Sequence, residues 1–174
     1  YGGWLVVDEA FMDCTPQHSL AEHSHLPGLI VLRSFGKFFG LAGSRLGFVL
    51  AHTGLLRSLA RLLGPWTVNG PTRQLGAVLL ADQSAQQRQR ECLHCDGQRL
   101  VDLLRRHELA PLGGCALFQW WVNADAALLH DVLARRGILT RLFAQPSSLR
   151  FGLPTDIGWA RLDQALQFFR EQHP

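Results

Sequence analysis

Lysine is almost absent from this 174-residue sequence, which has a single lysine, Lys37, and sixteen arginines. Long apolar runs are lacking too, since none approaches the roughly 18 residues of a membrane-spanning helix. There is also no basic stripe with interleaved aromatic residues, because the arginines behind the formal charge of +3 are scattered. The sequence therefore supports neither a membrane-bound protein nor a nucleic-acid-binding one.

The composition that remains is that of an ordinary globular protein, with 47% hydrophobic and 18% charged residues. This length suits one domain or parts of two. The chain begins with Tyr1, and an apolar run follows directly at residues 4–7. We therefore expect the chain to start inside a domain and to lack an N-terminal part.

Cys92 and Cys95 form a CxxC pair in a segment that is predicted to be helical. The apolar face of that helix contains Leu93, Leu100 and Leu104, and both cysteines point away from it. A zinc site needs about four convergent ligands, and neither a second cysteine pair nor a metal-ligand spacing of the histidines is present. We predict ordinary surface thiols, no metal site and a cytoplasmic location.

Hydrophobic patterns predict an α/β fold. Short strands apolar on both faces, typical of buried parallel strands, are expected at residues 4–7, 29–33 and 46–51. The other expected elements are helices at residues 55–63, 72–82, about 83–107, 125–136 and 156–171, and strands at 117–122, 138–141 and 148–152. Thr155 and Asp156 are the expected caps of the last helix. Glycine and proline at 111–114 predict two domains, residues 1–110 and 111–174.

Lys37 lies in the stretch RSFGKFFG, in an apolar neighbourhood. An amine can lose its proton and add to an aldehyde, whereas a guanidinium effectively cannot. If only charge were needed, this sequence would be expected to use arginine. Phe35, Phe38 and Phe39 argue against free exposure, so we predict a catalytic lysine; the alternative is a chance lysine on an exposed loop.

Further candidate residues flank this lysine. Asp8 ends an apolar strand, where open parallel sheets bind ligands; it either pairs with a protonated ring nitrogen or merely caps the following loop. Ser34 and Arg45, with glycines between them, form a possible phosphate cradle. An amine, a carboxylate and a phosphate cradle together suggest pyridoxal 5'-phosphate as cofactor.

The motifs VVDEAF (6–11) and LRSFGKFFGLAGSRLGF (32–48) resemble those of the class I/II aminotransferases, which are fold-type I pyridoxal-phosphate enzymes. The resemblance implies an aspartate aminotransferase-like fold: part of a large domain with a mixed or mostly parallel sheet, then a small C-terminal α/β domain. It also implies that Lys37 bonds to the cofactor aldehyde, that Asp8 pairs with the pyridine nitrogen, and that Ser34 and Arg45 hold the cofactor phosphate.

Two arginines in the last third of the chain match substrate-binding positions of the same family. Arg150, in SSLRFGLP, matches the arginine that grips the substrate carboxylate, and Arg141, in GILTR, matches one near the substrate's phosphate end. The residues themselves show only cations beside short strands, so a solvated arginine is the alternative at each position.

The chain also departs from the family pattern. Phe11 stands where many aminotransferases have a tyrosine that donates to the cofactor, and Gly36 stands where a serine or threonine is common. The family's glycine-rich phosphate loop, its ring-stacking aromatic residue and its asparagine precede the first strand seen here. A sheet without those strands would expose apolar edges, so we expect this segment alone to be inactive.

Within the family, the segments DEAFMDCTP, GPWTVNGP and GILTRLF most resemble those of the threonine-phosphate decarboxylases of cobalamin biosynthesis. This implies decarboxylation of L-threonine O-3-phosphate to (R)-1-aminopropan-2-yl phosphate by a homodimer. The alternatives are a histidinol-phosphate-type aminotransferase and a non-catalytic aminotransferase-like module.

Overall fold

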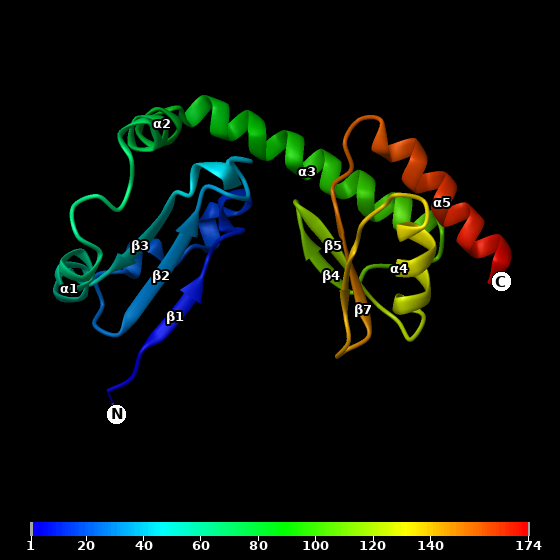
Figure 1. The fold of residues 1–174 in the computed structure, drawn as a ribbon, viewed down its shortest axis with the longest axis horizontal. Coiled ribbons are helices and arrows are strands. Elements are labelled where there is room, and N and C mark those ends of the chain that lie inside the picture. Colours follow the sequence, from blue (N-terminus) through cyan, green and yellow to red (C-terminus); the bar gives the residue numbers. More distant parts are fainter. Residues whose placement is uncertain (1, 174) are drawn as a thin grey trace. The chain divides into compact units, whose positions relative to one another are not determined.

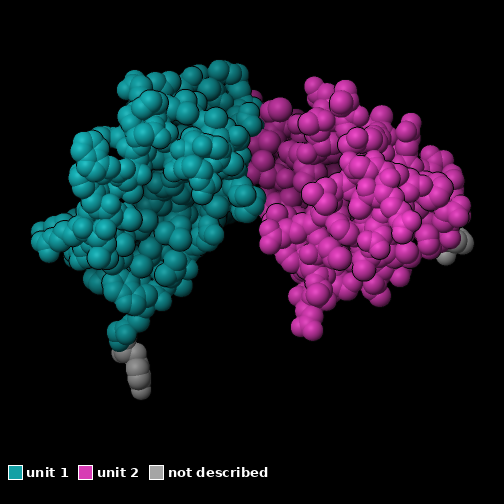
Figure 2. Space-filling view, viewed as in Figure 1, with its two compact units in different colours: residues 1–90 teal, residues 91–174 magenta. Residues whose placement is uncertain are grey.

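Two units make up residues 2–173, the part of the chain that the computed structural model describes. The first unit extends to Arg90 and the second begins at Glu91 (Figure 2). Each unit has its own β-sheet with helices, which confirms the predicted α/β class (Figure 1). Within the described residues, none of the helices combines the length and the apolarity that a membrane crossing requires.

The sheet of the first unit has three strands in the order β1-β2-β3. They are β1 (Leu5–Asp8), β2 (Leu29–Ser34) and β3 (Gly47–Ala51), each within one residue of its predicted bounds. β1 pairs in parallel with β2, whereas β3 is antiparallel to β2. The direction of β3 follows from its connection, because residues 35–46 contain only one 3-10 turn, η4 (Ala42–Ser44), and no crossover helix.

Strand β1 is exposed, so the prediction that it is buried is wrong. Leu5 and Val6 are 59% and 54% exposed. β1 is an edge strand and has only β2 beside it, whereas central β2 has Leu29 and Val31 buried. The apolar residues on both faces of β1 therefore did not predict how much of this strand is covered by other elements.

Three helices follow in the first unit: α1 (Thr53–Leu63), α2 (Gly70–Ala81) and the beginning of α3 (Gln83–Arg106). α2 begins two residues earlier than predicted, because the Asn69 side chain accepts a hydrogen bond from the Thr72 N–H at 2.9 Å and caps the helix. Asp82 lies between α2 and α3. Its carboxylate accepts from the Ala85 N–H at 2.8 Å, which lowers the pKa of this carboxyl group.

The part of α3 in the second unit has the predicted apolar face. Leu93, Leu100 and Leu104 are buried, while Cys92 and Cys95 are exposed thiols. The predicted orientation of the CxxC pair is therefore confirmed.

The second unit is built on a four-stranded antiparallel sheet in the order β4-β5-β7-β6. Its strands and helices are β4 (Gly113–Cys115), β5 (Phe118–Val122), α4 (Ala126–Ala134), β6 (Arg141–Phe143), β7 (Ser148–Gly152) and α5 (Gly158–Gln172). One core joins α3, α4, α5 and the sheet; its largest fully buried side chains are Leu100, Leu104, Leu129, Leu133, Leu149, Phe151 and Leu166.

Three local predictions in the second unit need correction. β4 was not predicted, because the sequence GGC has no alternating pattern. The strand expected at 138–141 begins at Arg141, since Gly137 (φ +68°) and the bond from the Ile138 N–H to the Leu133 carbonyl complete the end of α4. Thr155 and Asp156 do not cap α5, whose N-cap is Ile157 and has no side-chain capping bond.

Two helical glycines allow a matched test of the packing. A Cβ added at Gly97 in α3 would lie 2.9 Å from the backbone oxygen of Ala116, whereas one at Gly76 in α2 would meet the end of the Leu46 side chain. We expect Gly97→Ala to destabilise the full-length protein by about 1–3 kcal/mol, because backbone cannot move aside cheaply. Gly76→Ala should stay within about 1 kcal/mol, since the helix propensity of alanine offsets a small side-chain shift. Thermal unfolding of both variants would check this, and equal losses would contradict it.

Candidate active site

One end of the first unit's sheet brings together four of the predicted residues. Because β1 and β2 are parallel, Asp8 and Ser34 both end their strands at this edge (Figure 1). β3 is antiparallel and begins here, with Gly47 paired to Ser34. The chain between Ser34 and Gly47 contains Lys37 and Arg45, so both lie in the loop at the same edge.

Asp8 has an exposed side chain at the end of β1. Its Oδ1 accepts a hydrogen bond from the Ala10 N–H at 2.9 Å. This bond is the loop cap that we considered as the alternative role. It fixes the carboxylate while leaving it accessible, so the cap is compatible with a ligand-binding role.

Lys37 lies at the tip of the loop after β2. The expectation that aromatic neighbours would shield it is wrong, because Phe35 and Phe38 turn inward and are 2% exposed while Lys37 is exposed. Its Nζ lies 5.4 Å from the centre of the Phe11 ring. A cation over a ring face is favourable, so this contact holds the amine beside the segment that follows Asp8.

Ser34 and Arg45 lie at the two ends of this loop. The Ser34 hydroxyl oxygen accepts from the Gly36 N–H at 3.1 Å, which leaves the hydroxyl proton able to donate to a ligand. Arg45 is exposed, and its Nη1 donates to the Ala42 carbonyl at 3.2 Å. Its φ of 54° is a conformation that costs a non-glycine residue on the order of 1 kcal/mol, and such conformations cluster at functional sites.

A buried ionic cluster, missed in the sequence, lies next to these residues in the chain. Glu9 is 1% exposed, and its carboxylate accepts from the Ser19 hydroxyl at 2.6 Å, the Leu20 N–H at 2.7 Å and Arg33 Nη1 at 3.2 Å. The other terminal nitrogen of Arg33 donates to Asp13. The available signal was position, since Glu9 follows Asp8 and Arg33 precedes Ser34.

Arg141 and Arg150 are in the second unit, directly opposite each other on β6 and β7. Arg150, with Phe118 and Trp120, lines a cavity of about 300 Å³. Among the described residues, no acidic side chain forms an ion pair with either guanidinium. Two like charges placed opposite each other disfavour the sheet, so this arrangement suits an anionic ligand.

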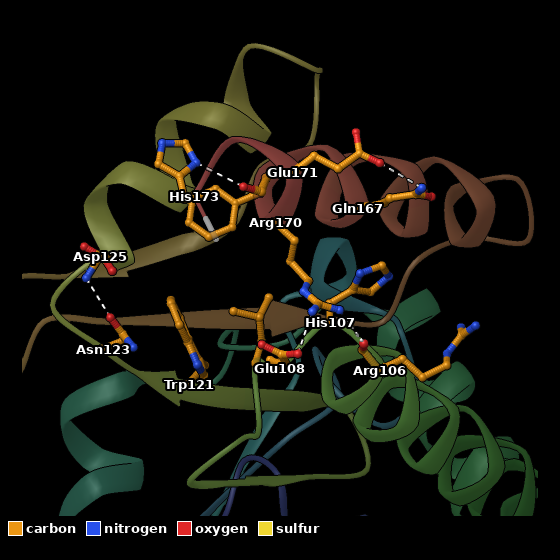
Figure 3. A pocket seen from close by; sticks show the side chains of 12 residues that line it. Arg106, His107, Glu108, Trp121, Asn123, Asp125, Gln167, Arg170, Glu171 and His173 are labelled. Atoms are coloured by element: carbon orange, nitrogen blue, oxygen red, sulfur yellow. Dashed lines mark hydrogen bonds and ion pairs between the residues drawn. The ribbon is translucent and has the colours of Figure 1, made fainter.

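A larger cavity of about 690 Å³ in the second unit contains none of the predicted residues (Figure 3). Several of its charged side chains already have partners in the protein. Arg170 pairs with Glu108 at 2.5 Å, and His107 pairs with Asp163 at 2.6 Å. We therefore interpret this cavity as a surface hollow whose ion pairs have a structural role.

Within residues 2–173, no group of three or more His, Cys, Asp and Glu side chains is arranged to hold a metal ion. The candidate site of the first unit consists of an amine, a carboxylate, a hydroxyl and a guanidinium at one sheet edge. The second unit separately has a pair of guanidinium groups on its own sheet.

Comparison with known proteins identifies relatives that are similar to this chain in sequence or in fold. Threonine-phosphate decarboxylase from Pseudomonas aeruginosa is 64% identical over 171 residues, covering 98% of this chain and 52% of that protein. Threonine-phosphate decarboxylase from Sinorhizobium sp. is 45% identical over 168 residues, covering 95% and 50%. The crystal structure of histidinol-phosphate aminotransferase from Sinorhizobium meliloti with pyridoxal-5'-phosphate is similar with a TM-score of 0.87 and 24% identity, covering 98% and 50%.

The chain thus spans about half the length of the curated relatives it matches. The fold is confirmed as that of the pyridoxal-phosphate-dependent aminotransferases by its similarity to a solved member. The model of aminotransferase class I and II matches residues 1–168, and the chain belongs to this family.

Proposed function

We propose that the full-length protein is a pyridoxal-phosphate-dependent lyase that decarboxylates L-threonine O-3-phosphate to (R)-1-aminopropan-2-yl phosphate, a step of cobalamin biosynthesis. The observation behind this proposal is the 64% identity to the threonine-phosphate decarboxylase of Pseudomonas aeruginosa over nearly the whole chain. Such identity within an enzyme family favours a shared reaction over a merely shared fold.

The donor set at the sheet edge fits the cofactor. When bound, pyridoxal phosphate withdraws electrons from the substrate bond that is to be broken. We propose that the Lys37 amine bonds to its aldehyde and that the Asp8 carboxylate keeps a proton on its pyridine nitrogen. Ser34 would donate its hydroxyl proton to the cofactor phosphate, and Arg45 would add a cation there.

The substrate has two anionic groups, a carboxylate and a phosphate, and the sheet of the second unit has two arginines without an acidic partner in residues 2–173. We propose that Arg150 holds the carboxylate and Arg141 the phosphate. Support comes from their opposed positions on β6 and β7 and from the absence of an acidic partner among the described residues. A guanidinium can hold either group through two parallel hydrogen bonds.

Transamination of a histidinol-phosphate-type substrate is the second candidate, because a solved histidinol-phosphate aminotransferase shares the fold at a TM-score of 0.87. That similarity, at 24% identity, concerns the fold. The identity to two decarboxylases is higher, at 64% and 45%, so we prefer decarboxylation.

The domain, oligomer and location assignments are also proposals. Residues 1–110 would be the C-terminal portion of the large cofactor-binding domain, including the connecting helix α3, and residues 111–174 the small domain. A homodimer is supported by Leu62, Leu63 and Trp66, which are 83%, 62% and 91% exposed. The four cysteines, which are thiols and not disulfides in the structure, support a reducing, cytoplasmic setting.

Replacing the only lysine tests the cofactor attachment. In the full-length protein, Lys37→Arg keeps the positive charge and Lys37→Ala removes it. Neither can bond to the aldehyde, so we expect both to lose the visible absorbance band of the lysine-bound cofactor and at least 99% of turnover. A visible band that persists in either variant would reject Lys37 as the attachment residue, and absence of the band in the parent protein would favour the non-catalytic module.

Asp8→Asn tests the partner of the ring nitrogen. The amide can still accept a hydrogen bond from the Ala10 N–H but cannot balance a protonated pyridine nitrogen. We expect cofactor binding to persist while kcat falls on the order of 100-fold or more. Cofactor titration and steady-state kinetics would check this, and a near-normal kcat would leave Asp8 as a loop cap only.

The products separate the two candidate reactions. Supplied with L-threonine O-3-phosphate, the full-length protein should release carbon dioxide and form an amino alcohol phosphate without keto acid. A parallel assay with histidinol phosphate and 2-oxoglutarate should give no glutamate. Keto acid or glutamate as the main product would instead indicate that the protein is an aminotransferase.

A further inference from the structure

The buried pair of Glu9 and Arg33 directly adjoins two of the residues assigned to the cofactor. We propose that this ion pair is a positioning device, which sets the alignment of β1 against β2 and thereby presents Asp8 and Ser34 to the cofactor. The proposal rests on the function proposed above, because it assigns the pair to the cofactor site and not only to folding.

The alignment of the two strands places the pair and the site residues on opposite faces. Asp8 is the partner of Leu32, and the Glu9 N–H donates to the Leu32 carbonyl at 2.8 Å, so the parallel pairing continues past the end of β1. Side chains alternate along a strand. Asp8 and Ser34 therefore face one side of the sheet, and Glu9 and Arg33 face the other, where Glu9 is buried.

A shift of one residue would exchange the two acidic side chains. Asp8 and Glu9 are adjacent, and a slip in strand alignment turns every side chain to the other face. Glu9 would then occupy the cofactor side, and Asp8, shorter by one methylene, would have to reach the buried donors. The bonds from Arg33, Ser19 and Leu20 to the Glu9 carboxylate oppose such a slip because they fit the longer side chain in its present place.

Arg33 extends this constraint to the next segments. One of its terminal nitrogens bonds both Glu9 and the Ser19 hydroxyl, and the other bonds the Asp13 carboxylate. The Asp13 carbonyl in turn accepts from Arg90 Nε at 2.9 Å, in the first turns of α3. The loop after β1 is thus bonded to β2 through the planar fork of Arg33 and to α3 through Arg90. A single ammonium in place of the Arg33 fork could not reproduce that geometry.

Stability by itself explains this ion pair poorly. Replacing a buried ion pair with apolar residues of similar volume is often neutral or stabilising, and the best-attested benefit of buried charges is to fix one arrangement over its alternatives. Here the arrangement that the pair fixes is the one that exposes Asp8 at the end of β1 and Ser34 at the end of β2.

The test uses Glu9→Gln in the full-length holoenzyme, with Asp163→Asn as the control. Asp163 pairs with His107 at 2.6 Å in the second unit, so the control removes an ion pair that contains none of the residues assigned to the cofactor. Both variants should lower the thermal unfolding midpoint. Only Glu9→Gln should raise the cofactor dissociation constant, by roughly 10- to 100-fold, the range seen when outer hydrogen-bond partners of binding residues are removed.

A spectroscopic readout separates positioning from general destabilisation. At saturating cofactor and low temperature, a correctly aligned site gives the parent visible circular dichroism per bound cofactor, however unstable the protein is. We expect Glu9→Gln to change this signal and Asp163→Asn to preserve it. If Glu9→Gln does not fold, Arg33→Lys, which keeps a charge beside Glu9 but cannot also reach Asp13, should show the same change.

The outcomes distinguish this proposal from the proposed function. A folded variant, Glu9→Gln or Arg33→Lys, with the parent dissociation constant and circular dichroism would overturn the positioning role and leave the enzyme assignment intact. A parent protein that binds no pyridoxal phosphate would overturn both.

Discussion

A carboxylate without access to water has to receive its hydrogen bonds from the protein, and Glu9 is such a group. Its donors come from two separate places in the chain: the loop at Ser19 and Leu20, and strand β2 through Arg33. Satisfying this one side chain therefore fixes a loop and a strand together. The same strand alignment that buries Glu9 on one face of the sheet also places Asp8 and Ser34 on the other face, at the edge where Lys37 lies.

The second unit has the opposite electrostatic arrangement. Its two facing guanidinium groups on β6 and β7 have no acidic partner among the described residues, and aromatic rings lie beneath them at 5.2 Å (Phe143 under Arg141) and 5.1 Å (Phe118 under Arg150). Ring faces support a cation without neutralising it. The first unit thus satisfies its buried charges internally, whereas the second unit keeps two charges available for an anion.

Motifs in the sequence were sufficient to predict which residues gather at the sheet edge, because strand ends and the lone lysine are local features. Burial was not predictable in the same way. The apolar run of β1 matches a buried strand, yet its exposure depends on the number of neighbouring strands, a property of the whole sheet. The Glu9–Arg33 pair joins residues 24 positions apart, so its only signal was its position next to the motif residues Asp8 and Ser34. β4 has no periodic pattern and gave no signal.

In the proposed roles, the residues at the sheet edge would serve any reaction of this cofactor, so they would not select between decarboxylation and transamination. Selection depends on which substrate bond is aligned for cleavage, and the substrate carboxylate is the group that differs between the two outcomes. A grip on that carboxylate by Arg150 would decide its orientation, since a guanidinium fork restricts rotation as well as position. The wall of the cavity beside Arg150, formed by residues such as Trp120 and Pro146, would then restrict how the rest of the substrate can turn. Under the proposed function, the first unit would supply the groups that hold pyridoxal phosphate, and the arginines of the second unit would orient the substrate and so set the product.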